Sequence, residues 1–457
     1  MSRSLTSITI LPEKSEATNS HLIKMSRRLY HYLQMENHRE LQIMVGTKTI
    51  RANIQIIDTL PRELHVPEEV FTYFCLPVRK VNLQAKYFSE SNTLKLGPVI
   101  GLLTDFSPKD GEEPNFRSIH KFCEDLHQVV SENGGFLYVF SFKHFLQHGY
   151  YFENGSWIGT SPPAPDVIYN RIHSRILENK QEFVEFRKIL EQLAIPIFND
   201  RFHSKWEVYD QLKNEHHLSS YIPETALLSR DTLHSFLQTY ETIFIKPIHG
   251  SQGKNIIKLE KIAEDQFTLQ TSGQSQADAL PALAAHEIYQ EIKLLLQNRI
   301  CIVQEGISFI DYQSSAMDFR VLVHRNYEKK WEITSIVARI GAEQEFVSNV
   351  SRGGHTIKPV TALRSKMSQK TALQTLKLIK ELSLETAEKV SALSSGITGE
   401  LGIDVGVDEK GKPWLIEVNS KPSKVFEDDS GKIRPSAKAI IRFCTSLAFE
   451  TLNEKEV

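Results

Sequence analysis

Hydrophobic and polar residues alternate over short segments in the first part of the chain. The period of two that is typical of half-buried strands is found in SLTSITIL, ELQIMVG, TIRANIQII and LQAKYF. The spacing of an amphipathic helix is found once, in SHLIKMSRRLYHYLQ. The pattern therefore predicts a small β-rich N-terminal domain over residues 1–97 with one helix.

From residue 98 the pattern changes to strands that alternate with helices. Strands are predicted in GPVIGLLTDF, FLYVFSF, DVIYNRI and IPIFN, and helices in NFRSIHKFCEDLHQVVSENG and QEFVEFRKILEQL. Apolar strands separated by amphipathic helices are typical of a sheet that is covered on both faces. Residues 98–200 are therefore predicted to form a three-layer α/β domain.

Strands and helices mix from residue 201 to the end of the chain. Helices are predicted in HEIYQEIKLLLQNR and KTALQTLKLIKELSLETAEKVSALSSG. The segment LEKIAEDQFTLQTSGQSQADALPALAA is rich in Ser and Gln in its middle and is predicted to be the most flexible stretch. Further on, LGIDVGVD and PWLIEVN alternate like strands around the turn EKGK, which predicts a hairpin.

The composition is that of an ordinary globular protein. The 457 residues include 54 Lys and Arg against 56 Asp and Glu, so the net charge of -2 gives no reason to expect nucleic acid or a membrane as a partner. The cysteines, Cys75, Cys123, Cys301 and Cys444, are scattered without a CxxC pair, which favours free thiols in a reducing compartment. Because the sequence has no N-terminal apolar segment and no run of 18 apolar residues, it predicts an intracellular protein.

Three side chains with oxygen atoms lie in the predicted hairpin. Glu417 and Asn419 are two residues apart, so they share one face of their strand, and strand pairing can bring Asp404 to the same face. Carboxylate and amide oxygens suit Mg²⁺, which takes one or two carboxylates together with substrate phosphates. A solvated hairpin with ordinary surface acids would have the same sequence, so both interpretations stay open at this point.

Two further segments contain residues that suit phosphate. Lys246 ends a predicted strand and is followed by a loop with Gly250, Ser251 and Gly253, whose backbone N–H groups can approach phosphate oxygens. Arg320 and Arg339 alternate with apolar residues, which predicts a cationic sheet face. The alternatives are a plain hairpin turn and a solvated sheet face.

The order of these segments resembles the ATP-grasp superfamily over residues 98–450, and within it the YheC/YheD family of endospore coat-associated proteins. The resemblance is carried by Lys205, FIKP, VQEGI, DFR, SNVSRGG and GIDVGVD with WLIEVN, together with LGPVIGLLTD and VIYNRI. It implies an α/β, partly α+β fold. An ATP-grasp domain at 201–457, with ATP between two lobes, would follow a pre-ATP-grasp α/β domain at 98–200.

The resemblance also implies a role for each matched position. The residues implied to bind ATP are Lys205, Lys246, Gly250, Ser251, Gly253, Gln304, Glu305, Ile307 and Asp318. Those implied to act at the phosphoryl-transfer centre are Arg320, Arg339 and Asn349. Those implied to bind one or two Mg²⁺ ions are Asp404, Glu417 and Asn419. The candidates for binding the carboxylate substrate are Arg171, Arg175, Ser351, Arg352 and Gly353.

The implied reaction is ATP-dependent ligation. A carboxylate attacks the γ-phosphate to form an acylphosphate, and an amine or thiol then displaces phosphate. The implied partners are a small-molecule or peptide carboxylate, an amine acceptor and spore coat proteins, in the cytoplasm or at the spore coat. Two other classes stay open: a coat-associated protein that binds ATP without turnover, and a phosphotransferase with a hydroxyl acceptor. Ligases that add glutamate to ribosomal protein often have Arg at the position of Val347, so their substrate chemistry is not carried over.

Overall fold

The computed structural model describes residues 5–14, 22–35, 40–59, 61–106, 113–250, 253–272, 280–297, 299–342, 345–348, 353–424 and 432–450. The chain forms two compact units. Unit 1 comprises Met1–Arg201, Arg325–Lys330 and Ser423–Val457, and unit 2 comprises Phe202–His324 and Trp331–Pro422. The division into three domains stays a prediction. The two units differ from it in that the C-terminal helix α11 (Pro435–Glu450) belongs to unit 1.

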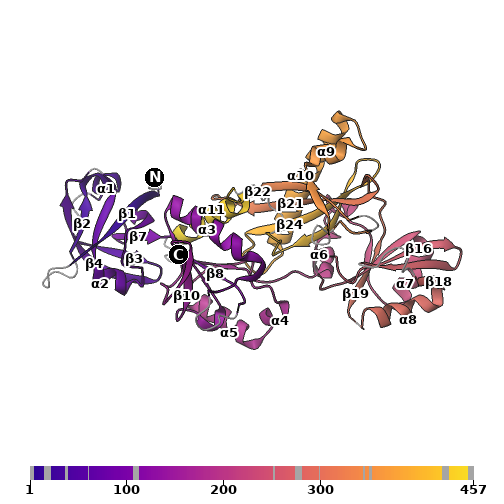
Figure 1. Cartoon of the computed structure of the whole chain (residues 1–457), viewed down its shortest axis with the longest axis horizontal. Helices are drawn as coiled ribbons and strands as arrows, with labels where there is room; N and C mark the ends of the chain where they lie inside the picture. The colour runs from indigo at the N-terminus through magenta and orange to yellow at the C-terminus, as the bar shows by residue number, and fades with distance from the viewer. Residues whose placement is uncertain are drawn as a thin grey trace. The chain divides into compact units, whose positions relative to one another are not determined.

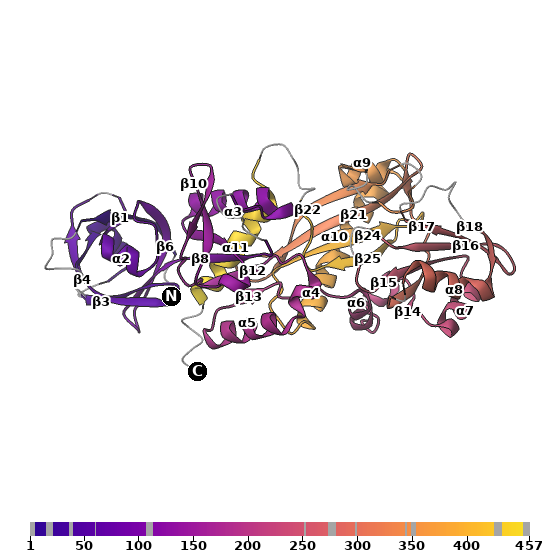
Figure 2. The same cartoon turned by 60° about the horizontal axis from the view of Figure 1, so that its bottom comes forward.

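Unit 1 begins with a closed barrel, in the strand order β1-β5-β2-β4-β3-β7-β6. Figure 2 shows these strands arranged in a ring. They are β1 (Thr6–Glu13), β2 (Leu22–Ser26), β3 (Glu40–Val45), β4 (Lys48–Ile57), β5 (Glu63–Pro67), β6 (Val81–Phe88) and β7 (Thr93–Gly97). Two short helices, α1 (Arg27–Tyr32) and α2 (Glu68–Tyr73), accompany them. The β-rich character predicted for this region is confirmed.

The single helix predicted over SHLIKMSRRLYHYLQ is wrong in its first half. Within this segment Leu22–Ser26 forms β2, and its apolar residues Ile23 and Met25 are completely buried. Ser26 ends the strand and caps α1, because its Oγ accepts a hydrogen bond from the backbone N–H of Leu29 at 3.3 Å. Alternating burial in the barrel therefore outweighs the helical spacing of the same residues.

The second part of unit 1 is a sheet with the strand order β11-β10-β9-β8-β12-β13. Its strands are β8 (Val99–Leu103), β9 (Phe136–Phe140), β10 (Gly149–Glu153), β11 (Ser156–Thr160), β12 (Val167–Asn170) and β13 (Ile197–Phe198). Helices α3 (His120–Asn133) and α11 cover one face, where Ile100 and Leu102 are buried, and α5 (Gln181–Gln192) packs with Leu103 on the other. The three-layer α/β prediction is confirmed, whereas the β10–β11 hairpin was not predicted.

Unit 2 contains a first sheet in the order β14-β19-β15-β16-β17-β18. Its strands are β14 (Thr225–Leu227), β15 (Thr242–Pro247), β16 (Ile257–Ala263), β17 (Gln266–Thr271), β18 (Leu280–Ala284) and β19 (Cys301–Glu305). Helices α7 (Arg230–Thr239) and α8 (Ala285–Leu295) pack against it (Figure 1). The stretch predicted to be most flexible includes most of β16 and all of β17 and β18, and its flexibility stays a prediction. Leu259 and Leu269 lie opposite each other there and are buried, while residues 273–279 lie outside the described residues.

The second sheet of unit 2 has the order β23-β22-β21-β24-β25, with β20 beside β21. Its strands are β20 (Asp311–Tyr312), β21 (Ser315–Arg325), β22 (Trp331–Ile340), β23 (His355–Ile357), β24 (Glu400–Val407) and β25 (Pro413–Asn419). Helices α6 (Lys205–Leu212), α9 (Pro359–Arg364) and α10 (Gln369–Ala392) share its apolar core. Strands β24 and β25 form the hairpin predicted from the sequence.

The cysteines are free thiols, as predicted from their spacing. Burial raises the pKa of the Cys301 thiol to about 11, so this cysteine is not an activated nucleophile. Among the described residues, none of the helices combines the length and the apolar character needed to span a membrane.

Candidate functional site

A cavity of about 460 Å³ lies between the two sheets of unit 2. Many residues that the sequence singled out line it together. They are Lys246, Gly253, Ile307, Asp318, Arg320, Arg339, Asp404, Glu417 and Asn419. Segments that are far apart in the sequence therefore meet in one place, as the resemblance implied for these residues.

Strand pairing explains why the charged side chains meet. Arg320 on β21 lies opposite Asp404 on β24, and Asp404 lies opposite Glu417 on β25. Residues directly opposite one another project from the same face of a sheet. Asp318 and Asn419 are each two residues from this row on their own strands, so they share that face. The three residues predicted to bind Mg²⁺ thus lie on one face of the hairpin.

The arginines of this face are paired with carboxylates. Nη2 of Arg320 donates to Oδ2 of Asp404 at 2.9 Å, and its Nε donates to the other carboxylate oxygen. Nη2 of Arg339 lies 3.0 Å from the same Oδ2, and Nε of Arg339 donates to Oδ1 of Asp318 at 2.6 Å. The four side chains are 6–16% exposed. The predicted cationic face is therefore wrong in its charge, because two guanidinium groups face two carboxylates.

The two carboxylates of this network differ in how readily they bind a proton. Burial alone would raise the pKa of Asp404, but Arg320 and Arg339 together outweigh it and hold the pKa below its usual value. Burial also raises the pKa of Asp318, and there Arg339, together with a hydrogen bond from Ser348, does not outweigh it. Asp404 therefore stays ionised, whereas Asp318 is the carboxyl of the pair that is protonated first.

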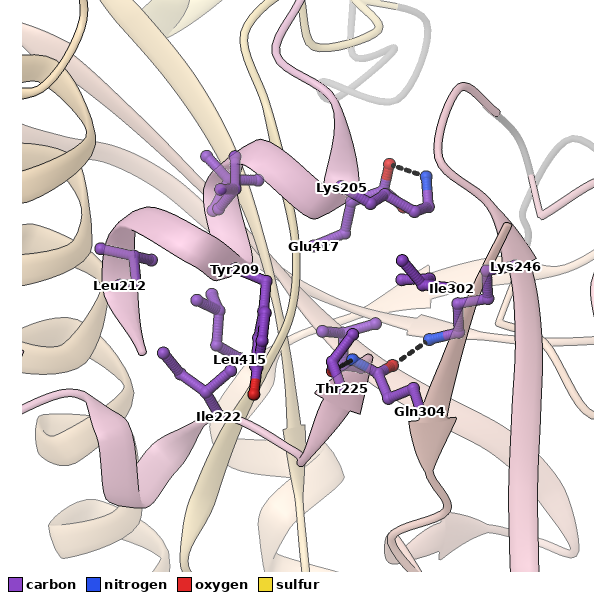
Figure 3. A pocket seen from close by; sticks show the side chains of 13 residues that line it. Lys205, Tyr209, Leu212, Ile222, Thr225, Lys246, Ile302, Gln304, Leu415 and Glu417 are labelled. Atoms are coloured by element: carbon purple, nitrogen blue, oxygen red, sulfur yellow. Dashed lines mark hydrogen bonds and ion pairs between the residues drawn. The ribbon is translucent and has the colours of Figure 1, made fainter. Parts of the chain in front are cut away.

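Lys205, the first residue of α6, reaches the end of this charged row (Figure 3). Its Nζ donates to Oε1 of Glu417 at 2.9 Å and to the carbonyl oxygen of Gly250 at 3.1 Å. The helix starts at this residue because Ser204 and Glu207 form a capping box. The cap thus fixes the position of the lysine, and the lysine ties the Gly-rich loop to β25.

Lys246 on β15 is held by a chain of hydrogen bonds, also drawn in Figure 3. Its Nζ donates to Oε1 of Gln304 at 2.6 Å, and Nε2 of Gln304 donates to Oγ1 of Thr225 at 2.9 Å. The three residues, with Lys205, line a smaller cavity of about 40 Å³ that shares Lys246 and Glu417 with the larger one. Burial and the charge of Lys205 together lower the pKa of Lys246 to about 8, although the charge of Glu417 opposes this shift.

The remaining predicted site residues lie elsewhere or outside the described residues. Glu305 accepts a hydrogen bond from the backbone N–H of Glu224 at 3.2 Å and is not among the residues that line the larger cavity. Gly353 is exposed, and in unit 1 Arg171 is buried after β12 while Arg175 begins α4 (Arg175–Glu178). The predicted residues outside the described residues are Ser251, Asn349, Ser351 and Arg352.

Aromatic residues that the sequence analysis missed line the larger cavity. They are Phe244, Phe309 and Phe346. The rings of Phe244 and Phe346 are 6.0 Å apart, and Phe244 lies two residues before Lys246 on the same face of β15. The spacing of two residues between Phe244 and Lys246 in the sequence could have predicted that Phe244 lies on the same face of the strand as the lysine. The apolar rings give the cavity a surface that suits a planar, apolar ring system.

Replacing Gly406 with alanine is expected to move Phe309 and to lower the free energy of unfolding by about 1–3 kcal/mol. A Cβ on Gly406 would lie 2.5 Å from ring atoms of Phe309, which line the cavity. Urea denaturation measures the change. Gly250→Ala is the matched control, because its Cβ would lie 3.7 Å from the nearest atom, the carbonyl oxygen of Pro247. Equal stability of the two variants would contradict the expectation.

Few of the described side chains are placed where they could bind a metal ion. The described residues contain no group of three or more His, Cys, Asp or Glu placed to hold a metal ion. The predicted ligands are two carboxylates and one amide, Asp404, Glu417 and Asn419, which all offer the oxygen atoms that Mg²⁺ takes. The chemistry of these residues fits Mg²⁺ shared with substrate phosphates better than a site made of protein ligands alone.

Comparison with known proteins gives matches along most of the chain. A family model described as YheC/D-like ATP-grasp matches residues 194–447. The endospore coat-associated protein YheD of Bacillus subtilis (strain 168) is 24% identical over 391 residues, which cover 84% of this chain and 85% of that protein. YheC of the same organism, also endospore coat-associated, is 24% identical over 281 residues, covering 60% and 75%. The D-alanine-D-alanine ligase from Coxiella burnetii has a TM-score of 0.46 and 11% identity, covering 78% and 96%.

Proposed function

This chain belongs to the YheC/D-like ATP-grasp family, and from that premise we propose that it is an ATP- and Mg²⁺-dependent ligase that joins a carboxylate to an amine or a thiol through an acylphosphate. Family membership confirms the resemblance and the ATP-grasp fold expected from the sequence. The observation that carries the proposal is the cavity of unit 2, whose wall brings together Lys246, two arginines and the oxygen donors of the hairpin.

In the proposed complex the aromatic and the charged residues of the cavity bind different parts of ATP. The aromatic rings of Phe244 and Phe309 pack against the base, because they offer apolar surface to a planar group. Lys246 and Lys205 donate to phosphate oxygens as point charges. Gly253 has a φ of 62°, so the loop next to the lysines adopts a backbone conformation that glycine tolerates without strain.

The charged row is the proposed centre of phosphoryl transfer. Bound Mg²⁺ supplies positive charge that offsets the negative charge of the phosphates. Asp404, Glu417 and Asn419 would hold it, and the charges of Arg320 and Arg339 hold the pKa of Asp404 below its usual value. The guanidinium groups stabilise charge that develops on the transferred group, since they are preorganised by their partners.

ATP affinity is expected to fall as the pH rises above about 8. Lys246 has a pKa of about 8, so its ammonium group loses its proton above this pH and its attraction for phosphate disappears. The dissociation constant should rise by at most about tenfold per pH unit, because one proton is involved. Calorimetric titration with ATP between pH 7 and pH 9.5 measures this. Lys246→Met is the control, and a variant with the same pH dependence as the parent would assign the effect to another group.

A second candidate function is that of an ATP-binding protein of the endospore coat without turnover. Two observations favour it. The relatives YheD and YheC are endospore coat-associated proteins by name. In addition, Asp404 and Glu417, the two carboxylates proposed for Mg²⁺, are already paired with Arg320 and Lys205.

The test is an assay of ATP turnover with candidate acceptors. The full chain would be incubated with ATP, Mg²⁺ and a pool of amino acids, short peptides and spore extract, while ADP and phosphate are measured. ADP formation that needs an added acceptor, with phosphate released in equal amount, supports the ligase. ADP formation with a phosphorylated product would establish a phosphotransferase, and tight ATP binding without turnover would establish the second candidate.

A further inference from the structure

A serine, a histidine and an aspartate form a connected set in unit 1. Oγ of Ser118 lies 3.1 Å from Nε2 of His173, and Nδ1 of His173 lies 3.0 Å from Oδ1 of Asp105. The same carboxylate oxygen accepts the backbone N–H of His173 at 2.6 Å. The aspartate therefore fixes both the main chain and the ring of the histidine, so that the second ring nitrogen faces the serine.

The topology of the sheet explains where these residues meet. β8 and β12 are parallel neighbours, and the chain runs from the end of β8 to Asp105 and from the end of β12 to His173. From β8 the chain first adds β9 on one side and later β12 on the other, so the strand order reverses between β8 and β12. In open α/β sheets, ligands bind outside the carboxyl ends of the strands at such a reversal.

The serine is on a short helical turn, η1 (Arg117–Ile119), directly before α3. Ser118 is exposed and the side chain of His173 is 26% exposed, so a ligand can reach both from solvent. Arg117 has a φ of 56°, which is uncommon for an arginine. Backbone strain of this kind is concentrated at functional sites.

The charges around the set favour an ionised aspartate. Burial alone would raise the pKa of Asp105, but hydrogen bonds from His173 and the charges of His173 and Arg117 outweigh it, so the pKa lies below its usual value. Nη1 of Arg117 lies 2.8 Å from Oδ2 of Asp105. The guanidinium group of Arg117 thus pairs with the carboxylate that orients His173, so this aspartate stays ionised beside the histidine.

We propose that Ser118, His173 and Asp105 form a second site, which transfers the acyl group of small carboxylic esters and is independent of the ligase function proposed for unit 2. The serine oxygen bonds to the carbonyl carbon as the bond to the alkoxide breaks, and the serine proton passes through Nε2 of His173 to the alkoxide. Water then attacks the acyl-serine, and its proton returns through the histidine to the serine. An ester and water thus give an acid and an alcohol.

The experiment is labelling of the full chain with a fluorophosphonate probe, with the labelled residue identified by peptide mass spectrometry. We expect the label on Ser118, with fluoride released, and slow hydrolysis of p-nitrophenyl acetate that needs neither ATP nor Mg²⁺. His173→Gln should slow labelling about 100-fold, which is the contribution of a general base, and Asp105→Asn should also slow it. Ser118→Ala should carry no label there.

The chain offers a matched control in the same unit. Oγ of Ser131 lies 3.2 Å from Nε2 of His127 on the exposed surface of α3, and in the described part of the chain no carboxylate hydrogen-bonds that histidine. Labelling of Ser118 no faster than Ser131, or labelling that is unchanged in His173→Gln, would show an exposed serine only and overturn the proposal. If Ser118→Ala does not fold, two results still test the proposal: the position of the label in the parent protein, and the rate at which His173→Gln is labelled.

Discussion

Replacing Glu417 with glutamine is expected to lower acceptor-dependent ADP formation by about 100- to 1000-fold, the effect of removing one preorganised charge from a transition state. Glu417 ends the charged row, lines the large cavity and accepts a hydrogen bond from Lys205 at 2.9 Å. Glutamine keeps the shape of this side chain but removes the charge that would hold Mg²⁺. The rate of ADP release at saturating ATP, Mg²⁺ and acceptor measures the change.

Two controls separate this effect from general damage. Glu409→Gln removes a carboxylate from the exposed turn of the same hairpin and should leave the rate unchanged. Binding of ATP without Mg²⁺ should not weaken in Glu417→Gln, because the change also frees Lys205 for phosphate. A variant that turns over ATP at the parent rate would show that Glu417 does not hold the metal.

The parts of the site that the sequence predicted are those that local spacing determines. Glu417 and Asn419 are two residues apart on one strand, and a short turn brings Asp404 opposite Glu417. These relations need only the period of a strand and the pairing of a hairpin. The three-layer part of unit 1 was predictable for the same reason, because its apolar strands are short and continuous.

The parts that the sequence did not predict depend on long-range pairing. Lys205 and Glu417 are 212 positions apart, and no local pattern shows that their charges meet. Likewise, Arg320 and Arg339 look like a cationic face until β24 places Asp404 between them. The helix expected over β2 failed because the barrel buries alternate residues of a segment that also has helical spacing.

The second large effect is expected on stability rather than on turnover. Replacing Arg339 with methionine should lower the free energy of unfolding by about 3–5 kcal/mol at neutral pH, as for other broken buried ion pairs. The change leaves the 7% exposed side chain of Asp318 without its guanidinium partner, whereas Asp404 keeps Arg320. Urea denaturation of the parent and the variant, followed by circular dichroism, measures the difference.

The pH dependence identifies Asp318 as the cause. Burial already raises the pKa of this carboxyl, and loss of Arg339 raises it further, so the native state of the variant binds a proton more tightly than the unfolded chain. Stability therefore increases as the pH falls toward that pKa, and the deficit of Arg339→Met should shrink on acidification. The double variant Asp318→Asn with Arg339→Met should recover most of the loss at neutral pH.

The exposed pair between Lys366 and Asp311 provides the matched control. Its atoms are 2.8 Å apart, but the two side chains are 37% and 43% exposed, so Lys366→Met should change the free energy of unfolding by less than about 1 kcal/mol. A deficit in Arg339→Met that is equally small, or that grows as the pH falls, would contradict the argument. In that case water must reach Asp318, and the arginine would be needed for phosphate rather than for the fold.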